Sequence, residues 1–291
     1  MSLIDIFNGS VGYVRANPRP TLGLTTAVVL ATTVLGFLAM LAASSSNSTV
    51  QSVAGIVIGG VGTMLAATLL SGMLTTIVAR SVLGCPITVA EAWQRVRGRL
   101  GALIALTVLE IVSATALIGV VTLTIVTVAD GAGGWTATLV GVPLVLLLIC
   151  GLTYLATALV LAPVAIVLEH RNVADAIRRS LALTRRRFWR TLGVLVLAGV
   201  VMVVVTGAVS LPFDVAASVV SFNAQPRTSG IVEPMLATIG QAVGQIITAP
   251  FIAGVVTLLY VDARIRLEAF DFTLLRVPAE AVGTDELWLE N

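Results

Sequence analysis

Side chains able to carry out catalysis or bind a metal are scarce in this sequence. It holds one histidine, His170, and two cysteines, Cys85 and Cys150, which lie far apart in or beside apolar stretches. Neither cysteine has the CxxC or Cys/His spacing of a metal or redox site, so both are interpreted as small buried residues. Motifs such as HExxH and GxSxG are missing as well. We therefore expect a non-enzymatic protein with no metal and no cofactor; the alternative is a membrane-embedded enzyme whose site has no recognised motif.

One acidic residue, Glu110, stands inside a long apolar stretch. It follows Arg99 by 11 residues, about 16 Å along a helix, which places its carboxyl near the centre of a bilayer. Acids in the membrane interior are functional candidates, because lipid does not tolerate an unpaired charge. Two interpretations stay open: a proton or substrate site, or a protonated acid bonded to a neighbouring helix through groups such as Gln241 and Gln245.

The 17 basic residues are all arginine, and most of them stand in clusters just before apolar runs. The strongest cluster joins three successive arginines to an aromatic pair, and guanidiniums there can hold phosphate in bidentate geometry while aromatics sit at headgroup depth. The residues expected to contact lipid headgroups or a partner protein are Arg95, Arg97, Arg99, Arg178, Arg179, Arg185, Arg186, Arg187, Trp189 and Arg190. Such a patch pressed against a bilayer is a poor site for nucleic acid.

Composition indicates that these residues belong to a membrane domain. Hydrophobic residues make up 57% of the 291 and charged residues 11%, with a mean hydropathy of +1.04, whereas a soluble domain carries about 25% charge. Apolar runs long enough to cross a bilayer as helices occur at about 21–43, 52–79, 100–128, 136–168, 191–212 and 236–260. The sequence therefore predicts an all-α, polytopic bundle of six transmembrane helices in a single membrane domain, 1–291.

The arginines also predict the orientation of these spans. With six spans, all arginines except Arg227 fall on one side of the membrane. The positive-inside rule places that side in the cytoplasm, together with both termini and a short tail at 271–291. The longest connection on the opposite side, about 213–234, is expected to fold over the outer face as a lid.

An internal repeat accompanies this layout. An oxygen-bearing side chain is followed three residues later by an acid at Ser2/Asp5, Thr88/Glu91 and Asn172/Asp175, which is the signature of a capping box at a helix start. Each match precedes arginines and an apolar run, so the chain is predicted to hold three units, at about 2–86, 87–170 and 171–270. Each unit would comprise an amphipathic helix lying in the membrane interface and a transmembrane hairpin.

Two segments, 173–190 and 259–271, together with Pro250, resemble the membrane domain that some bacteria fuse to glycerophosphoryl diester phosphodiesterases and that many actinobacteria carry as a stand-alone protein. The resemblance implies a membrane fold and, because that family is bacterial, a location in the plasma membrane of a bacterium. The phosphodiesterase activity of that family belongs to a separate soluble domain with metal-binding carboxylates and histidines, which this chain lacks. The triplet of residues 170–172 is therefore not expected to be catalytic.

The second of these segments carries alternating charges, Asp262, Arg264, Arg266 and Glu268. Pairing of the first with the third and of the second with the fourth at i,i+4 would stiffen the cytoplasmic end of the last span. We predict that this set forms a structural latch that also holds the surface helices, with Asp175 and Glu91 as partners.

The sequence thus favours a non-enzymatic membrane protein that organises lipids, chiefly anionic headgroups, or partner proteins at the cytoplasmic leaflet through arginine-rich interfacial helices. The alternative is a transporter or flippase for a lipid or small amphiphile, with a cavity near Glu110. Transporters are often built from repeats, although three repeats depart from their usual two-fold design.

Overall fold

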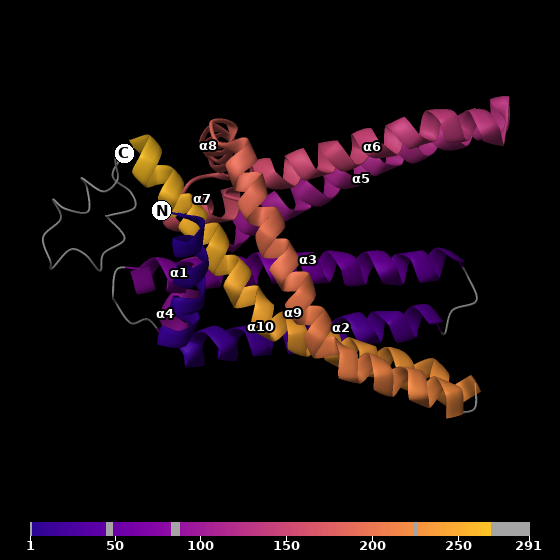
Figure 1. Cartoon of the computed structure of the whole chain (residues 1–291), viewed down its shortest axis with the longest axis horizontal. Helices are drawn as coiled ribbons and strands as arrows, with labels where there is room; N and C mark the ends of the chain where they lie inside the picture. Colours follow the sequence, from indigo (N-terminus) through magenta and orange to yellow (C-terminus); the bar gives the residue numbers. More distant parts are fainter. Residues whose placement is uncertain (1, 45–48, 83–87, 224–225, 269–291) are drawn as a thin grey trace, which may run out of the picture.

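The computed structural model describes residues 2–44, 49–82, 88–223 and 226–268, and within them every regular element is a helix (Figure 1). The helices are α1 (Leu3–Ala16), α2 (Pro18–Ser44), α3 (Thr49–Val82), α4 (Val89–Arg97), α5 (Leu100–Ala132), α6 (Gly134–Leu159), α7 (Ala162–Leu168), α8 (Val173–Arg185), α9 (Phe188–Asn223) and α10 (Pro226–Glu268). Six stretches of these helices are long and apolar enough to cross a membrane. The predicted helical membrane bundle with six spans is confirmed.

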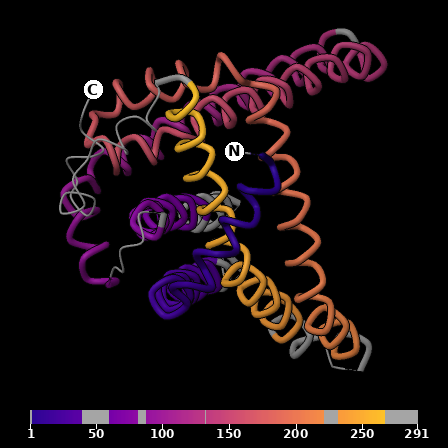
Figure 2. Tube along the Cα trace, turned by 60° about the vertical axis from the view of Figure 1, so that its left-hand side comes forward, coloured from indigo at the N-terminus to yellow at the C-terminus, as the bar shows by residue number. Residues whose placement is uncertain are grey.

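The helices form three successive units, as the repeat predicted. A short helix, α1, α4 or α8, precedes a long helical hairpin in each unit: α2/α3, α5/α6 and α9/α10. The three hairpins converge at the end of the molecule where the short helices gather and splay apart toward the other end (Figures 1 and 2). Helix α7 is a short continuation of α6 at the convergent end.

Two of the three predicted capping boxes are present. The Ser2 hydroxyl accepts from the Asp5 backbone N–H at 3.2 Å, and the Asp5 carboxylate accepts from the Ser2 N–H at 2.6 Å. The same reciprocal bonds join Thr88 and Glu91 at the start of α4. Asn172 occupies the N-cap of α8 but makes no side-chain cap bond, so the third capping box is a correction to the prediction.

The core lies at the convergent end. Buried apolar side chains from all three units meet there, among them Ile6, Ile77, Leu103 and Ile166. Helix α10 is the central element, since it packs on α9, α1, α2, α3, α7 and α8. The most apolar part of the α10 span has 61% of its residues buried within the chain, against 0% for α5, so the splayed hairpin α5/α6 leaves its apolar surface for lipid.

A break between α6 and α7 shapes this core. Pro163 stands at the start of α7 and cannot donate a backbone hydrogen bond to the preceding turn, so the fourth span divides after Leu159. The Ser180 hydroxyl of α8 donates to the Ala158 carbonyl at 2.6 Å beside the break. Every residue of α7 except Pro163 is buried. After α7 the chain reverses direction at His170, which has a left-handed backbone with φ 53°.

The outer connection of the third unit differs from its prediction. Helix α9 continues to Asn223 and α10 begins at Pro226, so most of the segment expected to form a lid is part of two helices. Proline at the first position of a helix loses no hydrogen bond, because that N–H has no partner in the helix anyway. The predicted tail, 271–291, and Cys85 lie outside the described residues.

Candidate functional site

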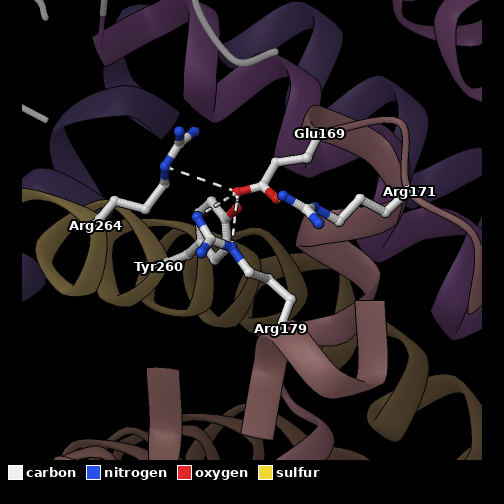
Figure 3. Close-up of polar contacts among 5 residues, drawn as sticks. All are labelled: Glu169, Arg171, Arg179, Tyr260 and Arg264. Carbon is white, nitrogen blue, oxygen red and sulfur yellow. Dashed lines mark hydrogen bonds and ion pairs between the residues drawn. The ribbon is translucent and has the colours of Figure 1, made fainter. Parts of the chain in front are cut away.

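The convergent end holds a buried carboxylate surrounded by arginines, which we term the inner acid cluster: Glu169, Arg171, Arg179, Tyr260 and Arg264 (Figure 3). The acid follows the last residue of α7, the tyrosine and Arg264 come from α10, and Arg179 comes from α8. The Tyr260 hydroxyl donates to Oε1 of Glu169. The cluster therefore joins the second repeat unit to the third.

The arginines approach both oxygens of the Glu169 carboxylate. Nε of Arg171 donates to Oε2 at 2.5 Å, and Nη2 and Nε of Arg179 donate to Oε1 at 3.2 and 3.3 Å. Nε of Arg264 lies 3.7 Å from Oε1. Only 4% of the Glu169 side chain and 1% of the Arg264 side chain are exposed, so this pair is shielded from water and counterions.

Burial disfavours the charged form of Glu169, but its neighbours outweigh that effect. The hydrogen bond from Tyr260, the charge of Arg179, the hydrogen bond from Arg171 and the charge of Arg264 together hold the pKa of the carboxyl below its usual value. The acid is therefore ionised at neutral pH. Three guanidiniums around one carboxylate leave the cluster with an excess of positive charge.

A second buried acid, Asp262, lies two residues after Tyr260 on α10 and also binds arginines. Nε of Arg266 donates to Oδ1 of Asp262 at 2.8 Å, so the i,i+4 pair expected from the spacing is present. Nη2 of Arg190, at the start of α9, lies 3.3 Å from the other oxygen. Asp262 thereby holds the two helices of the third hairpin together at their arginine-rich end.

The rest of the predicted latch is arranged differently. Arg264 reaches Glu169, while the Glu268 side chain lies outside the described part of the chain. The two acids expected to join the surface helices to the latch have other partners on or near their own helices: Glu91 lies 4.0 Å from Arg80, and Asp175 lies 3.8 Å from Arg178.

A second class of arginines stands at the corners where each short helix meets the first helix of its hairpin. These corner arginines are Arg15, Arg19, Arg97, Arg99, Arg185, Arg186 and Arg187. Within the described ranges, none of their guanidiniums makes a hydrogen bond or ion pair with the protein. All are exposed or half-buried. The repeat thus places unpaired positive charge at three equivalent positions.

Aromatic side chains accompany two of the corners. Trp189, directly after the third corner, is 82% exposed, while its neighbour Phe188 packs on Tyr154 of α6 with ring centroids 5.4 Å apart. Trp93 of α4 is 45% exposed. Exposed tryptophan beside arginine is typical of the membrane interface, where the indole lies at headgroup depth.

The structure divides the predicted contact residues between these two classes. Arg97, Arg99, Arg185, Arg186 and Arg187 are corner arginines. By contrast, Arg179 and Arg190 are engaged by the buried acids, because both face the core from the surface helix and its corner. Arg95 is half-buried on α4, and the exposed Arg178 lies beside Asp175.

The predicted intramembrane polar residues do not form one site. Glu110 is half-buried on α5. Gln241 and Gln245 instead line cavities between the first and third hairpins, with walls from α2, α3 and α10. Glu110 lines neither of these cavities, and in the described structure no hydrogen bond joins its side chain to either glutamine.

Sequence reasoning missed Glu169 as a site residue. The sequence does contain an indication of its role. An acid at the end of an apolar run, directly before an arginine-rich amphipathic helix, needs a cationic partner when that end is buried. The arginines form repeated clusters that are easily recognised in the sequence. The acids that bind some of them are single residues on distant elements, and no repeat marks them.

A family model described as a domain of unknown function, DUF7847, matches residues 94–263, more than half of the chain. The chain belongs to the DUF7847 family. The matched segment runs from the second half of α4 into the end of α10, so it covers most of the second and third units and contains both buried acids. The first unit precedes the DUF7847 match. No curated protein and no solved structure matches the chain.

Proposed function

We propose that this protein organises anionic lipids at one leaflet of the bilayer, with the corner arginines as headgroup contacts. The supporting observation is the division of the arginines. The buried acids engage those that face the core, and seven at the helix corners are left without a protein partner in the described structure. A phosphate-bearing headgroup supplies the missing anion, and guanidinium binds it in bidentate geometry.

The third corner is the strongest headgroup site in this proposal. Arg185 ends α8, and Arg186 and Arg187 follow before α9 begins at Phe188. The last carbonyls of α8 also favour positive charge at this place, which alone explains one or two basic residues. A run of three beside an exposed tryptophan favours an additional external anion.

The arginine-rich end faces the cytoplasm in this proposal, and the membrane is the plasma membrane of a bacterium. The support is the charge bias of the sequence, since loops rich in arginine stay on the cytoplasmic side. An introduced cysteine at Ser2 should react with a membrane-impermeant maleimide in inverted vesicles and stay unlabelled in intact spheroplasts. Labelling in spheroplasts would reverse the orientation.

The headgroup proposal is tested by tryptophan quenching in vesicles. Full-length protein is reconstituted into phosphatidylcholine containing a fraction of brominated phosphatidylglycerol, and the preference over brominated phosphatidylcholine is measured. Each arginine near an anionic surface contributes about 1 kcal/mol, so replacing the three arginines of the third corner by glutamine should lower the preference at that corner by up to roughly 100-fold.

The matched control replaces the same three arginines by lysine. Lysine keeps the charge and loses the bidentate geometry, so it should retain most of the preference, and 0.5 M salt should weaken it in both proteins. An unchanged preference in the glutamine variant refutes the proposal. A protein that co-purifies at one copy per chain and is released by the glutamine variant would assign the corners to a protein partner instead.

Transport of an amphiphile is the second candidate, and the cavities between α2, α3 and α10 are the observation that favours it. The transport route would then lie between the first and third hairpins and not beside Glu110. It would be supported by protein-dependent transfer of a fluorescent lipid between leaflets, abolished when the cavity is filled. The resemblance to the glycerophosphoryl diester phosphodiesterase membrane domain stays a prediction.

A further inference from the structure

A cavity of about 540 Å³ lies between the first and third hairpins. Its walls come from α2, α3 and α10, with Met202 of α9 at one side. A neighbouring cavity of about 210 Å³ continues it toward the splayed end and shares Thr32, Thr63 and Gln245 with it. The first volume alone falls within the range of ligand pockets, about 300–1,000 Å³.

The shared residues lie within the span of a bilayer, past its middle as counted from the arginine-rich side. Thr32 follows Arg19 by 13 residues and Thr63 precedes Arg80 by 17 residues, or about 20 and 26 Å along their helices. The hydrocarbon core is about 30 Å thick. The polar residues of the cavity are thus placed where water is scarce and where an unsatisfied polar group is costly.

The lining changes in character along its length. Toward the arginine-rich end it is formed mainly by apolar side chains such as Leu70, Leu74 and Val256, with Ser71 among them. Toward the splayed end the same space meets Thr63, Gln245 and, in the second cavity, Gln241. The cavity is therefore amphipathic: its lining is mainly apolar toward the arginine-rich end and more polar toward the splayed end.

The hydroxyls and the carboxamides of the polar part differ in one respect. Thr32 donates to the carbonyls of Val28 and Val29, and Thr63 donates to the Gly60 carbonyl, so these hydroxyls are satisfied by their own helices. In the described structure the side chains of Gln241 and Gln245 have no hydrogen-bond partner. They are one helical turn apart on α10 and both line the cavities, so together they offer two amide donors and two acceptors to a ligand.

We propose that these cavities bind an uncharged amphiphile: a long hydrocarbon chain with a hydroxyl, ester or amide head. The chain lies against Leu74 and Val256, and the head is held by Gln241 and Gln245. A neutral head follows from the lining, because none of the described residues around either cavity is ionisable. The site is separate from the corner arginines and differs from them in charge preference, so each proposal can fail alone.

The test uses full-length protein in phosphatidylcholine vesicles and three photoactivatable probes of equal chain length: a long-chain alcohol, the matching carboxylate and the matching alkane. Crosslinks are mapped by mass spectrometry. The alcohol is expected to label peptides of α2, α3 and α10 that line the cavities, in competition with unlabelled alcohol. Even labelling of all lipid-facing peptides, or preferential labelling by the carboxylate, would overturn the proposal.

Filling the cavity should remove the labelling. Ala249→Phe on α10 and Ala67→Phe on α3 place a ring in the space from two walls, and each is expected to lower specific labelling by roughly tenfold. Ala208→Phe is the matched control, because Ala208 is exposed on α9 and does not line the cavities. Equal labelling in all three variants refutes the site. Size-exclusion profiles identify any variant that misfolds.

Removing the carboxamides tests the head group. With Gln241 and Gln245 replaced by leucine, labelling by the alcohol should fall by roughly two- to tenfold for each hydrogen bond lost, while labelling by the alkane should not fall. A parallel loss of both labels would mean that the glutamines serve only packing and would overturn the assigned head group.

Discussion

Replacing Glu169 by glutamine tests whether the inner acid cluster holds the convergent end together. The substitution keeps the shape of the side chain and an acceptor for Tyr260, but it removes the carboxylate that the three guanidiniums share. Arg264, with 1% of its side chain exposed, cannot turn toward water. Breaking a buried ion pair by removing one of its two charges costs about 3–5 kcal/mol.

The other two arginines of the cluster contribute less to the free energy of unfolding. Arg171 and Arg179 expose 35% and 18% of their side chains, so solvent screens part of their interaction and can replace part of it. We therefore count only the buried pair with Arg264. At about 2–4 °C per kcal/mol for a chain of this size, the melting temperature of Glu169→Gln should fall by about 6 °C or more.

Thermal unfolding of detergent-solubilised protein, followed by the loss of the monodisperse size-exclusion peak, measures this effect. Asp175→Asn is the matched control, since Asp175 and Arg178 are 3.8 Å apart and expose 51% and 82% of their side chains. An exposed pair contributes at most about 1 kcal/mol, so this control should melt close to the wild type. Equal melting temperatures for the two variants would refute the reasoning.

The double variant Glu169→Gln/Arg264→Met separates a charge effect from a loss of packing. Methionine removes the buried charge that has lost the Glu169 carboxylate, and replacing both members of a buried ion pair by uncharged groups is often close to neutral. The double variant should recover at least half of the lost stability, or restore folding if the single variant fails to fold. A double variant less stable than the single one would show that Arg264 acts independently of Glu169.

Acid dependence gives a second measure of the same cluster. The folded-state pKa of Glu169 lies below its ordinary value of 4.5, so its contribution to stability is fully present above that value and is lost as the pH falls through the folded pKa. The wild type should therefore lose stability below about pH 4.5, and Glu169→Gln should lose less over the same interval. Identical acid profiles would contradict an ionised Glu169 in the folded state.

Three further substitutions and one control test the packing of the convergent end by the same melting assay. Gly254→Ala should destabilise the protein by about 1–3 kcal/mol, because an added Cβ would lie 2.5 Å from Tyr13. Its control is Gly199→Ala, which should leave stability unchanged because an added Cβ there meets no atom within 4 Å. Ser180→Ala should cost about 1–3 kcal/mol by leaving a buried carbonyl unpaired. Thr184→Val should leave stability unchanged or raise it, because its buried hydroxyl has no hydrogen-bond partner; a large loss would reveal a bond formed through water.

The fold was largely predictable because membrane helices obey one dominant constraint. Apolar runs of sufficient length must be helical in lipid, and the number of runs can be counted from the distribution of apolar residues along the sequence. The units were also visible, since an N-cap such as Thr88 is encoded within four residues. Helix ends were less predictable: α9 and α10 extend beyond their apolar runs into the polar outer connection, because a hairpin can satisfy the backbone without lipid around it.

The site was only partly predictable, because ion pairs depend on contacts between distant elements. The i,i+4 pair of Asp262 and Arg266 is a local feature and was found from spacing. The bonds of Glu169 to Arg179 and Tyr260 span 10 and 91 residues, and no local pattern encodes them. The sequence likewise predicts that the glutamines of α10 bond to Glu110. Their depth in the membrane can be estimated from the sequence, but the sequence does not show which helix faces them.

The two classes of arginine have a common origin in the repeat and differ through the acids around them. Each unit places arginines where a surface helix meets a span, a position favoured by the positive-inside rule whether or not a ligand exists. The described structure has buried acids only at the junction of the second and third units, Glu169 and Asp262, and both are engaged by core-facing arginines. The corner arginines are therefore in excess of what the fold uses. An excess repeated at three corners around one core presents several anion contacts in the plane of one leaflet, which suits a protein that gathers lipids better than one that binds a single molecule.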